Sequence, residues 1–194
     1  MLQILIKNHE NAMKGNTYMD IGKELEELSN SELEELGTRL KIAPDMRIHL
    51  SKGHIHKLEK RHYTQRPDDK PDGFWYGFGD EWIDWTETAG PERKGKYVYE
   101  IEINGSNILQ IKDYSEIAEF TKEYESGKQI IPGKIFSIDW SRVELKYDGI
   151  EINPYVDQAR IDDKFLWYYG WDVASGCIWN LEKVNIMLVG LLEY

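Results

Sequence analysis

One stretch, residues 97–103 with the sequence Tyr-Val-Tyr-Glu-Ile-Glu-Ile, constrains the fold more than any other part of the chain. In its second half, isoleucine and glutamate alternate one by one. Because successive side chains of a β-strand point to opposite faces of a sheet, this alternation predicts a strand with one buried face and one more polar face. We therefore expect β structure in the main body of the protein.

Other segments extend this pattern along the chain. Strand-like segments cover residues 46–50, 74–78, 108–111, 149–153, 165–169, 177–181 and 184–192. Helices are expected over 51–61, from 81 to 86 and over 114–124, whereas 66–73 and 127–134 are typical of loops. Helices come first in the chain and strands with few helices follow. This order predicts the α+β class, with a twisted and mostly antiparallel sheet.

The first 45 residues differ in composition from the rest. Between residues 20 and 40, leucines recur at helical spacing with acidic residues between them. Ser31 and Glu34 have the spacing of a capping box, which predicts two helices rather than one, and Pro44 ends the region. We therefore divide the chain into an N-terminal helical cap or arm, residues 1–45, and a main domain, residues 46–194.

Charge and cysteine content limit the partners and the compartment. Lys and Arg number 24 and Asp and Glu number 35, so the formal charge is −11. Such a surface repels phosphate backbones, which favours a protein partner over a nucleic acid. The single cysteine, Cys177, excludes an internal disulfide and fits a reducing, cytoplasmic compartment. We find no membrane-spanning run and no signal-peptide pattern.

Several common catalytic motifs are absent from the sequence. It has no phosphate-binding loop, no dinucleotide glycine fingerprint, no His-Glu-x-x-His zinc motif and no Gly-x-Ser-x-Gly elbow. His54 and His56 could form a metal-binding pair, but on a helix their spacing of two places them on different faces. We therefore expect no metal site.

Three short motifs follow one another along the main domain. They are His-Leu-Ser at 49–51, Gly-Phe-Trp-Tyr at 73–76 and Tyr-Asp-Gly-Ile-Glu at 147–151. Read in this order, they resemble the ADP-ribosyltransferase superfamily, specifically its His-Tyr-Glu branch, which includes the poly(ADP-ribose) polymerases, the diphtheria-type toxins and some phage-encoded modifiers. The resemblance covers roughly residues 46–192.

The resemblance implies a fold and a reaction. The fold would have a split, twisted and mostly antiparallel sheet. The reaction would transfer ADP-ribose from NAD to a macromolecular acceptor and release nicotinamide, with NAD as co-substrate and without a metal. The compact size is associated with a bacterial or phage origin.

It also implies roles for individual residues. The transition state of the transfer builds positive charge at the ribose carbon, which the Glu151 carboxylate would stabilise. One of two neighbouring aromatic residues would stack on nicotinamide, since neighbours on a strand face opposite ways. The residues assigned to NAD are His49, Ser51, Arg47, Gly73, Trp75 and Tyr76.

Two positions depart from the family pattern, and a third leaves open which branch of the superfamily the chain resembles. Trp75 stands where the family usually has Tyr. Gly149 stands two residues before Glu151, where arginine-specific transferases carry Glu or Gln, so arginine is not the expected acceptor. Arg47 lies on the same strand face as His49 and could be the Arg of the Arg-Ser-Glu branch, although the position of Ser51 favours His49.

Two other functions are compatible with the sequence. The chain could be a catalytically silent protein of the same fold that binds NAD or ADP-ribose, or an acidic interaction or inhibitor protein that uses its N-terminal helices. The segment 171–179 is rich in Trp and is interpreted as a hairpin with its turn at 174–176. Cys177 lies in this segment, and its thiol is expected in the core.

Overall fold

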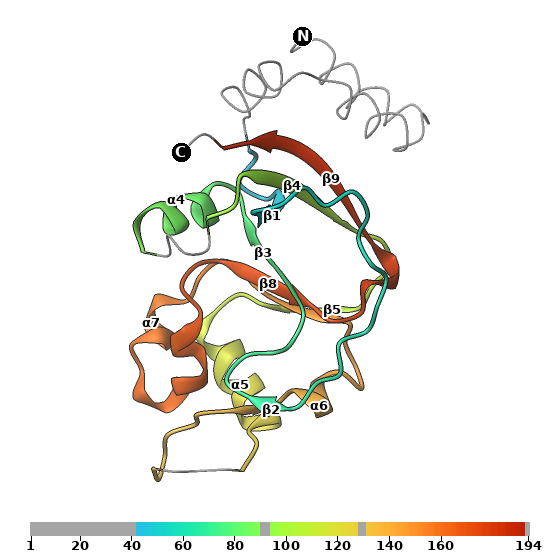
Figure 1. The fold of residues 1–194 in the computed structure, drawn as a ribbon. Helices are drawn as coiled ribbons and strands as arrows, with labels where there is room; N and C mark the ends of the chain where they lie inside the picture. The colour runs from blue at the N-terminus through green and yellow to red at the C-terminus, as the bar shows by residue number, and fades with distance from the viewer. Residues whose placement is uncertain (1–41, 90–93, 128–130, 193–194) are drawn as a thin grey trace.

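The framework of the protein is one seven-stranded sheet of order β5-β7-β8-β3-β1-β4-β9 (Figure 1). The computed structural model describes residues 42–89, 94–127 and 131–192. The strands of the large sheet are β1 (Arg47–Ser51), β3 (Phe74–Phe78), β4 (Tyr97–Ile103), β5 (Ile108–Ile111), β7 (Gly149–Ile152), β8 (Ser175–Ile178) and β9 (Val184–Leu191). Every neighbouring pair is antiparallel except β5 and β7. The expected mixed α and β class with a mostly antiparallel sheet is confirmed.

Short helices and one small strand pair complete the described residues. The pair joins β2 (Pro67–Asp68) to β6 (Ile138–Asp139). The helices are α4 (Glu81–Thr88), α5 (Tyr114–Tyr124), α6 (Trp140–Val143) and α7 (Asp157–Arg160), with the 3₁₀ helices η2 (Asp163–Gly170) and η3 (Leu181–Lys183). Nearly all of the proposed arm, 1–45, with its expected helices over 20–40, lies outside the described residues.

Helix α5 lies in the connection between the two parallel strands. Its first turn is capped by the Asp113 carboxylate, which accepts the backbone N–H of Glu116. Ile117, Phe120 and Tyr124 follow at helical spacing and are buried against the sheet. The helix expected over 114–124 is thus confirmed, because its apolar stripe has a sheet face to cover.

The two faces of the sheet belong to different parts of the core. On one face, α5, α6, α7 and η2 gather at the β5–β8 end, as Figure 1 shows, and bury most of the tryptophans. On the other face lie Tyr76, Tyr99 and Ile178, against which Ile55 and Leu58 pack from the loop after β1. Alternate residues of each strand therefore face different surroundings.

The helix expected over 51–61 is wrong. Ser51 is instead the last residue of β1, opposite Tyr97, and the following residues form a loop. The backbone N–H of Ile55 donates to the Tyr99 hydroxyl at 2.6 Å, and Leu58 packs on the core beneath. These tertiary contacts outweigh the local helical preference.

Two expectations in the last third of the chain are also wrong. Residues 165–169 belong to η2 rather than to a strand, because Phe165, Trp167 and Tyr168 turn inward to fill the space beside α5. Residues 174–176 do not form a hairpin turn; Ser175 opens β8, which is paired on both sides, with β3 and β7. The expected strand over 177–181 thus lies earlier, at 175–178, and η3 begins at Leu181.

The close approach of α4 to β3 is directly testable. A Cβ atom on Gly77 would lie 2.5 Å from the Cβ of Trp82, whereas a Cβ on Gly53 would meet nothing within 4 Å. We expect Gly77→Ala to lower the free energy of unfolding by about 1–3 kcal/mol and Gly53→Ala to change it by less than about 0.5 kcal/mol. Urea unfolding of both variants measures the difference, and equal effects would contradict this packing.

Candidate active site

The centre of the candidate site is the Glu151 carboxylate in the middle of β7, with only 1% of the residue exposed. Its Oε1 accepts a hydrogen bond from Arg47 Nε at 2.5 Å and another from the Tyr76 hydroxyl at 2.7 Å. Its Oε2 accepts one from Arg47 Nη2 at 3.2 Å and one from Gln110 Nε2. Four donors thus fill the acceptor positions of one buried anion, which would be costly to bury without them.

The register of the sheet brings these residues together. Glu151 lies opposite Gln110 on β5 and opposite Gly176 on β8, and Gly176 lies opposite Tyr76 on β3. These four residues form one row across four strands and share a face. Arg47 comes from β1 on the far side of β3 and spans 104 positions of sequence to reach Glu151.

Gly176 leaves the space through which Tyr76 reaches the carboxylate. A Cβ atom at this position would lie 2.6 Å from Cζ and 2.7 Å from the hydroxyl oxygen of Tyr76. Since such contacts are shorter than real Cβ atoms make, any other residue would displace the ring. Glycine is therefore required here for space within a strand, not for a turn.

The electrostatics of the cluster fix its protonation at neutral pH. Burial acts to raise the pKa of the Glu151 carboxyl, but the hydrogen bonds from Arg47, Gln110 and Tyr76 hold it below its ordinary value. Burial, followed by the neighbouring carboxylate, raises the pKa of Tyr76 well above its ordinary value. The site therefore holds an ionised glutamate, a charged arginine and a protonated tyrosine.

Of the two candidates for the first motif, Arg47 and not His49 bonds to Glu151. The His49 ring lies 4.2 Å from that of Phe74, and its Nδ1 is 2.7 Å from the backbone oxygen of Trp75. A carbonyl only accepts, so this nitrogen carries a proton. Burial lowers the pKa of His49, which keeps the imidazole neutral. Ser51 Oγ donates to the backbone oxygen of Gly53.

The two aromatic candidates on β3 face opposite sides of the sheet. Tyr76 accompanies Glu151, whereas Trp75 lies against Trp171, with 4.9 Å between the ring centroids. Gly73, directly before β3, packs closely against β8, because a Cβ there would lie 2.6 Å from Cys177 Sγ. Of the two aromatics, Tyr76 is therefore the one that lies beside Glu151.

Sequence reasoning missed two members of the site, Gln110 and Gly176. Gln110 lies within a short apolar strand and becomes a neighbour of Glu151 only through the parallel pairing of β5 with β7. A polar residue in an otherwise apolar strand, Ile-Leu-Gln-Ile, is the one local signal that could have indicated it. Gly176 gives no such signal, since its sequence neighbours also fit a turn.

Within residues 42–89, 94–127 and 131–192, no group of three or more His, Cys, Asp or Glu side chains is placed to hold a metal ion. No helix in the same ranges combines the length and apolar character that crossing a bilayer requires. Comparison of the chain with protein-family models, with curated proteins and with solved structures finds no match.

The lowered pKa of Glu151 predicts a pH-dependent contribution to stability. A carboxyl whose pKa is lower in the folded state stabilises the fold above its unfolded pKa of about 4.3, and this contribution is lost as pH falls through the folded value. We expect the difference in unfolding free energy between wild type and Glu151→Gln to be largest above about pH 5 and to shrink in more acidic solution. Urea unfolding from pH 3 to pH 7 measures this, and a constant difference would argue against it.

Proposed function

We propose that this protein is an NAD-dependent ADP-ribosyltransferase in which Glu151 is the carboxylate beside the reacting ribose. The observation that carries the proposal is the meeting of Arg47, Tyr76 and Glu151 in one hydrogen-bonded cluster. These residues come from three strands that hold the three motifs of the resemblance, and they are far apart in sequence. The ADP-ribosyltransferase-like character of the mostly antiparallel sheet is part of the same proposal.

The chemistry asked of Glu151 is electrostatic. As the bond between the ribose carbon and the nicotinamide nitrogen breaks, its electron pair leaves with nicotinamide and positive charge develops on the ribose. A fixed carboxylate stabilises that charge and accepts a hydrogen bond from a ribose hydroxyl. A nucleophilic group of the acceptor then bonds to the ribose carbon and loses its proton to solvent.

A ribose hydroxyl needs one acceptor position on the carboxylate. Tyr76 is fully buried, whereas Gln110 is exposed, so Gln110 is the donor that an incoming ribose replaces at least cost. The side chain of Arg47 is 35% exposed, which leaves its guanidinium edge open to a phosphate of NAD. The site would thus open by movement of a surface amide while its buried donors stay in place.

The acceptor is proposed to be a protein and not an arginine side chain. The net charge of −11 disfavours a nucleic acid. Two residues before Glu151 stands Gly149, where a Cβ would lie 2.8 Å from the Cys177 carbonyl oxygen. That position therefore has no room for the Glu or Gln that arginine-specific transferases carry.

A second candidate function rests on the same cluster. All four acceptor positions of Glu151 are occupied by side chains of the protein, and a carboxylate paired in this way stabilises a cation less. This favours a catalytically silent protein that binds NAD or ADP-ribose. The acidic interaction protein stays a third alternative, based on residues 1–45.

Nicotinamide release from NAD by the purified full chain tests the proposal. We expect Glu151→Gln, which keeps the size and removes the charge, to lower the rate by about 100-fold or more, as loss of one electrostatic group does in other enzymes. Glu102→Gln is the matched control, because Glu102 bonds only weakly, to Asn185 at 3.4 Å, and it should keep the wild-type rate.

The other outcomes separate the alternatives. If wild type releases no nicotinamide but calorimetry detects NAD binding, the silent binder replaces the transferase. If there is neither release nor binding, both proposals are wrong and the interaction protein is favoured. If Glu151→Gln and Glu102→Gln lowered the rate of nicotinamide release equally, Glu151 would have no special role in the reaction.

A further inference from the structure

A second site lies on the face of the sheet opposite Glu151. A cavity of about 360 Å³ is bounded by β3, by α4 and by the segment from the end of η2 to the start of β8. Its position follows from strand alternation, because Trp75 and Ser175 point away from the side on which Tyr76 lies. Its volume falls within the range of about 300–1,000 Å³ that is usual for small-molecule pockets.

The walls of this cavity are mainly tryptophan. Four of the seven tryptophans of the chain line it: Trp75, Trp82, Trp85 and Trp171. Trp82 packs directly over Gly77, and Trp171 is buried, while the other three are half-buried. Large aromatic side chains left partly exposed around a hollow provide flat surfaces for another ring.

The indole N–H of Trp171 marks a missing hydrogen-bond acceptor. Trp171 is 1% exposed, yet its Nε1 has no partner in the part of the chain that the structure describes. The other fully buried indoles differ: Trp140, Trp167 and Trp179 donate to Asp68, Thr121 and Tyr147 respectively. A buried donor without a partner is rare in folded proteins, and this one belongs to a wall of the cavity.

Lys70 supplies the charge at this cavity. Its Nζ lies 5.2 Å from the centroid of the Trp75 ring, and its stem passes over Gly170, where a Cβ would lie 2.8 Å from Lys70 Cε. Asp172, which also lines the cavity, is paired with Arg160 at 3.0 Å. The Asp69 carboxylate lies near Gly170 too, where a Cβ would be 3.9 Å from its Oδ2. Lys70 is thus the cation that an anionic group of a ligand would meet at this wall.

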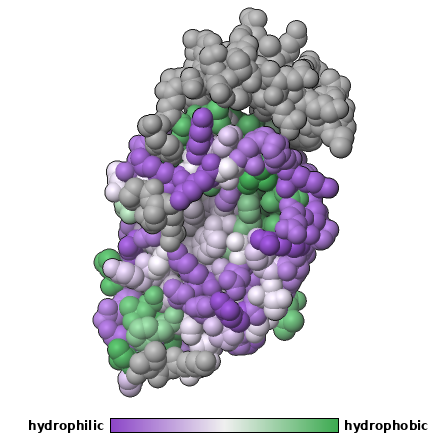
Figure 2. Space-filling view, in the orientation of Figure 1, coloured by the Kyte–Doolittle hydropathy of each residue, from purple (hydrophilic) through white to green (hydrophobic). Residues whose placement is uncertain are grey.

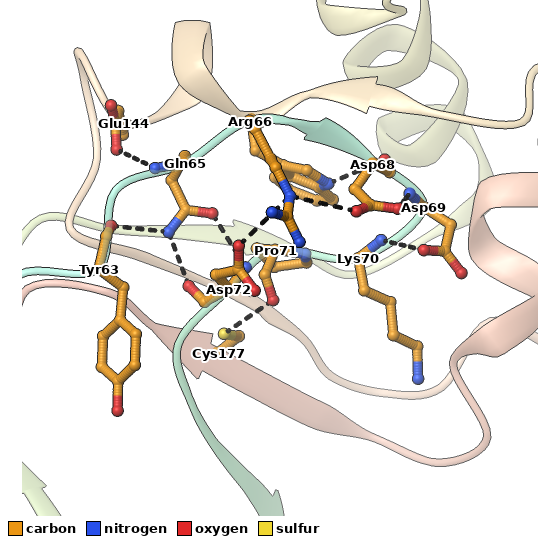
Figure 3. A network of polar contacts seen from close by, with 11 residues as sticks. Tyr63, Gln65, Arg66, Asp68, Asp69, Lys70, Pro71, Asp72, Glu144 and Cys177 are labelled. Carbon is orange, nitrogen blue, oxygen red and sulfur yellow. Dashed lines mark hydrogen bonds and ion pairs between the residues drawn. The ribbon is translucent and has the colours of Figure 1, made fainter.

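The loop that carries Lys70 is held in place by a buried amide (Figure 3). Gln65, 4% exposed, donates through Nε2 to the backbone oxygens of Tyr63 and Asp72 and accepts the backbone N–H of Asp72. Glu144 anchors the loop from the other side by accepting the backbone N–H of Gln65. Lys70 is thus presented by a preorganised loop, which lowers the cost of ordering it on binding.

We propose that this cavity binds a nucleotide base, that is, a planar heteroaromatic ring with a hydrogen-bond acceptor and an anionic substituent. The ring stacks among the tryptophans and its phosphate lies near Lys70. Its acceptor receives the Trp171 N–H, which a rotation of the indole must first bring to the cavity surface because Nε1 is fully buried. The site does not depend on Glu151, since the sheet separates the two. A free nucleotide and the adenosine half of NAD share this chemistry.

Calorimetric titration of the full chain with AMP tests the proposal. We expect Trp171→Phe, which keeps a ring and removes the N–H, and Lys70→Met each to weaken AMP binding at least tenfold. Trp179→Phe is the matched control, because it makes the same change at an indole bonded to Tyr147, and Glu151→Gln is the control for the other face. Both controls should bind AMP as wild type does, with near-UV circular dichroism confirming the fold of every variant.

Several results would overturn this site. Absence of AMP binding, binding that is unchanged in both Trp171→Phe and Lys70→Met, or binding lost in Glu151→Gln alone would each do so. Binding of tetramethylammonium in place of AMP would show a cation site instead. Titration of NAD into the Glu151→Gln variant distinguishes a free nucleotide from the adenosine half of NAD as the ligand. If the variant still binds NAD and AMP displaces it, the adenosine of NAD binds in this cavity. AMP binding without nicotinamide release would leave this site standing and the transferase wrong.

Discussion

The neutralisation of one buried carboxylate is the constraint on which much of this structure depends. Glu151 lies in the interior of a sheet, where an unpaired negative charge would be strongly unfavourable. Its donors come from β1, β3 and β5, and the gap that admits one of them lies on β8. A slip of one residue in any of these pairings would send a donor to the wrong face. The ion pair therefore defines the register of five strands together.

The sheet consequently carries two faces of different chemistry. One holds the polar cluster around Glu151 and the core residues on which Ile55 and Leu58 pack, and the other holds helices and a cavity walled by tryptophan. Figure 2 shows that hydrophilic residues cover much of the visible surface, with an apolar patch at the lower left. The aromatic richness of the chain is thus divided between core and cavity wall.

Local patterns in the sequence predicted what depends on local physics. The alternation at 97–103 and the apolar stripe at 114–124 both identified their elements. The helix has one face to bury, whereas the strand buries one face in its second half and both faces at Val98 and Tyr99. The predictions of a helix over 51–61 and of a strand over 165–169 were wrong, because contacts with residues distant in sequence determine the conformation of both segments. Within the site, Glu151 and Tyr76 follow from motifs, whereas Gln110 required a non-local pairing. Spacing alone did not separate Arg47 from His49, because both point to one side of β1.

The neighbouring positions of Trp75 and Tyr76 have a mechanical consequence. Consecutive Cα atoms are about 3.8 Å apart, so a single peptide unit joins a wall of the tryptophan cavity to a donor of the buried carboxylate. The carbonyl of that unit is held by the His49 ring, which limits its rotation. A displacement of this peptide unit would therefore move side chains on both faces of the sheet together, and its pairing with β8 and the hydrogen bond to His49 oppose such a displacement.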